Sequence, residues 1–137
     1  MTWIKIETEN LNKVPNLDGL EFNENGLFLH CDFFDGVQKT LFFENFFSMR
    51  MIDEGNALKM MAGQPLDGIG WLFHNTESDL SAWFNDTSFD IHKDEYKSYV
   101  VAALFHIVEV LSKKPPVILD NTDCNDHIIK CSCEIIK

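Results

Sequence analysis

Basic residues are scarce in this chain, and the shortage limits the partners it can bind. Its 137 residues hold 11 lysines and arginines against 22 aspartates and glutamates, for a formal net charge of -11 at pH 7. Such a charge repels phosphate backbones and anionic membrane surfaces. We therefore expect no direct binding of nucleic acid and no membrane contact, and we expect attraction to a basic protein.

The sequence also lacks long apolar runs and has few cysteines. No stretch reaches about 18 apolar residues, which a membrane-spanning helix needs, and MTWIKIETENLNK has no basic region before an apolar run. We expect a cytoplasmic protein. Three of the 4 cysteines lie near the C-terminus, which is typical of reduced thiols and predicts no structural disulfide.

Motifs that accompany catalysis or phosphate binding are missing as well. The chain has no G-x-S-x-G, no caspase-like or papain-like cysteine sequence, no P-loop and no G-x-G-x-x-G. We predict no catalytic residues. An acid–base enzyme stays open as an alternative, because the pairing of the 22 carboxylates in space is not visible in a sequence.

One cluster near the C-terminus has the residue types of a zinc site, namely Cys124, His127, Cys131 and Cys133. The paired C-x-x-C of structural zinc sites is absent, and alternating cysteines also suit the buried face of a strand. The aspartates of the run 120–126 lack the glycine and distant glutamate of a calcium loop. We predict no metal site and no cofactor.

The residues that are present predict one β-rich domain over 1–137, since 45% are hydrophobic and can supply one core. Asn25-Gly26 and Asp35-Gly36 separate short apolar runs and predict two hairpins. Residues 39–51 predict a strand, an irregular break and a strand, with Phe46 and Phe47 filling the core at the break.

A helix is predicted over residues 79–85, with Ser78 or Thr76 as its cap. Three apolar residues at i, i+3 and i+4 are predicted to share its buried face: Leu80, Trp83 and Phe84. The chain is predicted to open with a strand over residues 3–8, followed by a loop over 10–19. Residues 96–106 and 107–111 are predicted to form one long bent strand or a hairpin, and closing strands are predicted at 118–119 and 127–136. The predicted fold class is α+β, mainly β: an antiparallel sheet or half-barrel with one short helix packed against it.

Acidic residues are concentrated between positions 77 and 95, where a single lysine, Lys93, stands among six carboxylates: Glu77, Asp79, Asp86, Asp90, Asp94 and Glu95. This segment has two interpretations. It could dock against a basic nuclease active site, with charge steering the encounter. It could instead be the solvated side of a helix and its following loop.

Several polar landmarks lie on strand patterns between residues 40 and 118: Leu41-Phe42-Phe43-Glu44, Met49-Arg50, Asp53-Glu54-Gly55, Trp83-Phe84, Glu109-Val110-Leu111-Ser112 and Pro115-Pro116. In these the chain resembles small bacterial immunity proteins, which are encoded beside polymorphic or contact-dependent growth inhibition toxins. The resemblance implies a cytoplasmic protein that binds one cognate toxin domain and blocks its active site or substrate path. It implies no catalytic residues. The candidate contacts are acidic: Asp53, Glu54, Glu77, Asp79, Asp86 and Asp90.

Other interpretations remain. Asp53 and Glu54 could merely end a strand at Gly55, and Arg50 could only neutralise a neighbouring carboxylate. An enzyme would be supported by a deep polar pocket around His30, His106 or Glu109. A small β-rich ligand-binding module would enclose an apolar cavity. Tight packing around four phenylalanines would argue against such a cavity: Phe28, Phe42, Phe46 and Phe105.

Overall fold

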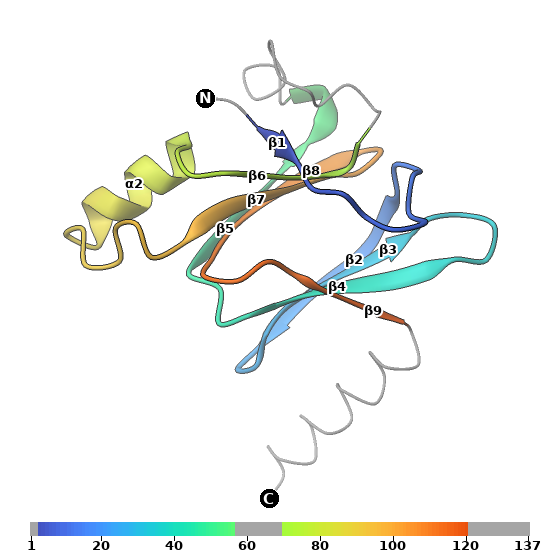
Figure 1. Cartoon of the computed structure of the whole chain (residues 1–137), viewed down its shortest axis with the longest axis horizontal. Helices are drawn as coiled ribbons and strands as arrows, with labels where there is room; N and C mark the ends of the chain where they lie inside the picture. The colour runs from blue at the N-terminus through green and yellow to red at the C-terminus, as the bar shows by residue number, and fades with distance from the viewer. Residues whose placement is uncertain (1–2, 57–69, 121–137) are drawn as a thin grey trace, which may run out of the picture.

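The computed structural model describes residues 3–56 and 70–120, and within them the chain forms two antiparallel sheets and one α-helix (Figure 1). The five-stranded sheet has the order β1-β6-β7-β8-β5, with β1 at Ile4–Lys5, β6 at Leu72–Asn75, β7 at Lys97–Ala102, β8 at His106–Ser112 and β5 at Ser48–Asp53. The four-stranded sheet has the order β2-β3-β4-β9, with β2 at Asn16–Asn23, β3 at Gly26–Asp32, β4 at Gln38–Glu44 and β9 at Val117–Asp120. The mainly β, α+β class is confirmed, with two open sheets in place of one sheet or a half-barrel.

Both predicted hairpins are present, although the first turn lies one residue earlier than predicted. Asn23 pairs with Gly26, so the β2–β3 turn consists of residues 24–25 and Gly26 begins β3. Gly26 has φ +147, and a Cβ there would lie 2.2 Å from the carbonyl oxygen of Phe43. This glycine therefore permits a close approach of two strands. The second hairpin joins β3 to β4 through a loop that is left-handed at Phe34, Asp35 and Gly36.

The irregular break predicted within residues 39–51 is where the chain changes sheets. β4 belongs to the four-stranded sheet and β5 to the five-stranded sheet, and Asn45 between them has φ 53. Phe46 packs against the core between the sheets, and Phe47 packs against the helix cluster. Asn has a short polar side chain that tolerates this left-handed conformation, so the sequence suits the crossing.

Two other range predictions are decided by the structure. Residues 97–112 form the β7–β8 hairpin and not one bent strand, because β7 pairs antiparallel with β8. The predicted loop over 10–19 is wrong at its end, since β2 begins at Asn16 and pairs with β3 across an irregularity between Leu17 and Gly19. Pairing with a neighbouring strand overrides the turn-forming composition there. The predicted strand at 127–136 lies outside the described residues.

The main core lies between the sheets, where apolar side chains of both meet, among them Leu29, Phe43, Tyr99 and Val108. Phe28 and Phe42 form a separate buried stack, with ring centroids 4.7 Å apart. Phe105 lies outside this core, because it belongs to the β7–β8 turn and is 64% exposed. Within the described part of the chain, no helix has the length and apolar character needed to cross a membrane.

Candidate functional site

The α-helix, α2 at Asp79–Thr87, lies beside the ends of β6 and β7 (Figure 1). Ser78 is its N-cap: the Ser78 hydroxyl accepts from the backbone N–H of Ser81, and the Ser81 hydroxyl accepts from the backbone N–H of Ser78. Of the two predicted caps, Ser78 is therefore the one used. The helix runs two residues past the predicted end at position 85.

One face of α2 packs on the five-stranded sheet through Leu80 and Phe84, which contact Phe47, Tyr96 and Leu111. Leu80 and Phe84 are four residues apart, as a buried helical stripe requires. Trp83 is not part of this stripe, which corrects the prediction. It is 55% exposed and shares the outer face with residues three or four positions away, Asp79 and Asp86.

The loop from Ser88 to Glu95 is held by short turns. Its first residues close the helix, because the N–H of Asp90 bonds to the carbonyl of Asn85 at 2.8 Å and that of Phe89 bonds to Asp86 at 3.3 Å. The ring of His92 points back and stacks on Phe47, with centroids 4.5 Å apart. Phe89 and Ile91 face solvent, with 93% and 69% of their surface exposed.

We call the outward residues of α2 and this loop the helix–loop surface. It consists of three apolar side chains, six carboxylates and one lysine: Trp83, Phe89, Ile91, Glu77, Asp79, Asp86, Asp90, Asp94, Glu95 and Lys93. All ten are exposed. Four of the six predicted contact residues thus belong to α2 and the segments next to it, and all four are exposed.

The other two predicted contacts lie elsewhere. β5 begins at Ser48, which pairs with Leu111 beside α2, and ends at Asp53, so Asp53 and Glu54 lie at the far end of this strand. A carboxylate oxygen of Asp53 accepts a 2.8 Å hydrogen bond from the N–H of Gly55. This bond closes a turn, as the alternative interpretation of these residues expected.

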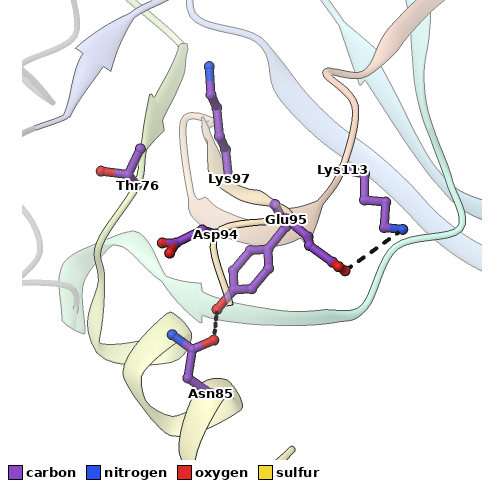
Figure 2. Close-up of a pocket in the computed structure, with 7 residues that line it drawn as sticks. Thr76, Asn85, Asp94, Glu95, Lys97 and Lys113 are labelled. Atoms are coloured by element: carbon purple, nitrogen blue, oxygen red, sulfur yellow. Dashed lines mark hydrogen bonds and ion pairs between the residues drawn. The ribbon is translucent and has the colours of Figure 1, made fainter. Parts of the chain in front are cut away.

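Two hollows flank the helix–loop surface. One, of about 310 Å³, is lined by the residues drawn in Figure 2, where the hydroxyl of Tyr96 donates a 2.7 Å hydrogen bond to Asn85 and Lys113 lies 4.0 Å from Glu95. Burial raises the pKa of Tyr96 above its ordinary value of 10.0. Its phenol therefore stays protonated at neutral pH and serves as a donor, not as a base.

The second hollow has a volume of about 410 Å³ and lies between the start of α2 and the loop. Three carboxylates and one ammonium group are among its lining: Glu77, Asp79, Asp94 and Lys93. This excess of negative charge suits a cationic side chain.

Glu109 has a completely buried side chain on β8, and its partners account for its charge. One carboxylate oxygen accepts from Arg50 Nε at 2.7 Å and lies 2.6 Å from a terminal nitrogen of the same guanidinium. The other accepts from the hydroxyls of Ser78 and Ser98. Arg50 therefore neutralises a neighbouring carboxylate, as expected, and both oxygens of Glu109 are engaged in holding strands and helix together.

His30 lies between two polar side chains, and the three form a line across the four-stranded sheet. Its Nδ1 lies 2.8 Å from the hydroxyl of Thr40, and its Nε2 lies 2.5 Å from a carboxylate oxygen of Glu21. Hydroxyl, imidazole and carboxylate follow each other as in a nucleophilic triad. The Thr40 side chain is buried, however, so its hydroxyl does not face a site that a substrate could enter.

Neither of the two hollows beside α2 is lined by His30, His106 or Glu109, the residues around which a polar pocket would support an enzyme. His30 lies on β3 in one sheet, whereas His106 and Glu109 lie on β8 in the other. Among residues 3–56 and 70–120, no three potential ligands gather as a metal site. The candidate zinc residues Cys124, His127, Cys131 and Cys133 lie outside the described ranges.

Comparisons with protein-family models, curated proteins and solved structures find no match for this chain. The resemblance to immunity proteins is therefore a prediction from the sequence alone.

Two apolar members of the helix–loop surface were missed by sequence reasoning, Phe89 and Ile91. The signal was present in the sequence: both are apolar, and both are next to Asp90 within the acidic segment. Apolar residues between carboxylates are compatible with a surface position, where single exposed apolar residues are common.

Proposed function

We propose that this protein is a cytoplasmic immunity protein that binds a cognate bacterial toxin domain and neutralises it by covering its active site or substrate path. The observation that carries the proposal is the helix–loop surface, whose exposed side chains include six carboxylates and one lysine. Opposite charges raise the rate of encounter between two proteins and fix the orientation in which they dock. No catalytic residue is needed for this function.

The charge of the surface suits one class of toxin best. A toxin that cleaves RNA or DNA binds phosphates through lysine and arginine side chains. An acidic surface competes with the nucleic acid for the same side chains and can cover the site where the nucleic acid would bind. We therefore propose a nuclease domain as the partner.

The placement of two carboxylates supports binding over plain solubility. Asp86 lies in the last turn of α2, Asp90 follows the helix, and the last turn has no basic residue. Carbonyl groups at a helix C-terminus make a negative charge unfavourable there, by roughly 0.3–1 kcal/mol for an exposed group. A partner that supplies positive charge at this point would offset that cost.

The test is binding of the protein encoded next to this chain, followed by titration of the affinity against salt. We expect a nanomolar complex whose dissociation constant rises with salt concentration, because screening weakens attraction between exposed charges. Replacing Glu77→Gln, Asp86→Asn and Asp90→Asn together should slow association and flatten this salt dependence.

A matched variant removes three carboxylates elsewhere: Glu9→Gln, Glu24→Gln and Glu44→Gln. These side chains are exposed and belong to the N-terminal segment and the four-stranded sheet. We expect the matched variant to bind nearly as the natural chain does. Equal effects of the two triple variants would mean that only net charge matters, and absence of any complex would overturn the proposed function.

A further inference from the structure

Phe89 occupies a position in the fold that normally belongs to glycine. Ser88 is the C-cap of α2, so Phe89 is the residue after the cap, and its φ is 53. The hydrogen bonds from Phe89 to Asp86 and from Asp90 to Asn85 form the helix-ending pattern that most often has glycine at this position. A side chain with a Cβ is unfavourable in this left-handed conformation.

Among residues 3–56 and 70–120, the ring of Phe89 makes no contact that would explain its presence. Phe89 is 93% exposed, so its side chain contributes almost nothing to the core. A residue that breaks a local rule without a folding benefit is expected at functional sites. Two other exposed apolar residues, Trp83 and Ile91, lie with it within residues 83–91.

Hydrogen bonds within the loop fix the backbone around Phe89. The N–H of Ile91 bonds to the carbonyl of Ser88, and the N–H of Lys93 bonds to that of Asp90, so successive turns fix the backbone. On the inner side, His92 stacks on Phe47 and its Nδ1 lies 3.1 Å from Glu95. A loop whose backbone is fixed before binding loses little backbone freedom on binding, so chiefly the side-chain rotamers of Phe89 remain to be ordered.

We infer that Phe89 is the central apolar anchor of a protein–protein interface, with Trp83 and Ile91 beside it and a rim of carboxylates. The inference rests on the proposed function and identifies the contact surface. The occupant is a basic protein surface with an apolar socket, because the immediate neighbours of Phe89 carry negative charge: Asp90 follows it in the chain, and the N–H of Phe89 bonds to the carbonyl of Asp86. Binding energy in such interfaces is concentrated in a few buried anchors, and the surrounding polar rim excludes water.

The decisive variant is Phe89→Gly, measured against the protein encoded next to this chain. Glycine accepts the left-handed backbone, so the isolated variant should melt at the same temperature as the natural chain or higher. Its dissociation constant should rise by about thirtyfold or more, chiefly through faster dissociation. Trp83→Ala should weaken binding by about tenfold.

Two exposed phenylalanines outside the surface serve as controls. Phe22 on β2 is 72% exposed, and Phe105 lies in the β7–β8 turn. We expect Phe22→Ala and Phe105→Ala to bind within about twofold of the natural chain, as is common away from anchor residues.

The outcomes separate this inference from the function on which it rests. If the natural chain binds no neighbouring protein, the proposed function fails. If it binds tightly and Phe89→Gly binds within about threefold, the function stands and the anchor assignment is wrong. Loss of binding together with a lower melting temperature would also overturn the inference, because Phe89 would then have a structural role.

Discussion

The hydroxyl of Ser78 donates a 2.5 Å hydrogen bond to a carboxylate oxygen of Glu109 and so joins the cap of α2 to the middle of β8. The same oxygen accepts from Ser98 on β7, and the other oxygen pairs with Arg50 on β5. One buried carboxylate thus connects three neighbouring strands and the helix. The position of the helix–loop surface relative to the sheet depends on this group.

Glu109→Gln should destabilise the fold by about 3 kcal/mol, because it leaves the Arg50 charge without its partner in a largely buried place. The figure is at the lower end for a buried pair, since the Arg50 side chain is 34% exposed and water can solvate part of it. Urea unfolding followed by circular dichroism measures the loss. The double variant Arg50→Met with Glu109→Leu should lose less, because no charge is left alone. A change below about 0.5 kcal/mol in Glu109→Gln would contradict this role.

Ser78→Ala should cost about 1–3 kcal/mol, because it removes both the helix cap and a hydrogen bond to a buried carboxylate. Thr76→Ala is the matched control. Thr76 was the other cap candidate in the sequence and is exposed, so its truncation should change the free energy of unfolding by less than about 0.5 kcal/mol. Chemical denaturation of both variants checks the prediction, and equal losses would show that Ser78 does not act as the cap.

Local signals in the sequence were enough to predict several elements. The hairpins followed from Asn-Gly and Asp-Gly between apolar runs, and the helix followed from a cap and a short apolar period. The division into two sheets was not predictable, because it depends on pairing of distant segments such as β4 with β9. Trp83 was wrongly placed because two neighbouring stripes of a short helix are both plausible until the sheet selects one.

The charge of the candidate site was predictable from the sequence, whereas the arrangement of its residues in space was not. The acidic excess between positions 77 and 95 is visible in the sequence, and four of the predicted contacts fall on one surface. Asp53 and Glu54 do not, because sequence offers no measure of the distance between the end of β5 and α2. Phe89 was missed although an apolar residue in the acidic segment was visible, because its left-handed conformation at the end of α2 cannot be read from the sequence.

Gly26→Ala should destabilise the β2–β3 hairpin by about 2–4 kcal/mol, because the new Cβ meets backbone and the φ of +147 suits only glycine. Gly36→Ala is the comparison. Gly36 also has a positive φ, +81, but a Cβ there meets nothing within 4 Å, so only strain of about 1 kcal/mol is expected. Thermal unfolding of both variants distinguishes the cost of the close contact from the cost of backbone strain. Equal losses of stability would mean that the chain relaxes freely around the new Cβ at position 26.

Cys31 lies on the buried face of β3, where its thiol is almost inaccessible. Burial raises the pKa of this thiol from its ordinary value of 9.0 to about 12, and the negative charge of Asp18 acts in the same direction. The buried thiol is therefore uncharged under all ordinary conditions and is a poor nucleophile while the protein is folded.

The raised pKa of Cys31 makes stability depend on pH in the alkaline range. Below pH 9.0 the thiol is protonated in both the folded and the unfolded chain, so it adds no pH dependence to the stability. Between pH 9.0 and about 12 only the unfolded chain releases the proton, so the stability falls as pH rises. From about pH 8 to about pH 10.5, the natural chain should lose about 2 kcal/mol more than Cys31→Ala does. Tyr96 and Tyr99, whose pKa values burial also raises, contribute equally to both chains and cancel in the comparison. Urea unfolding at the two pH values measures the difference, and parallel losses in the two proteins would show that the thiol ionises without unfolding.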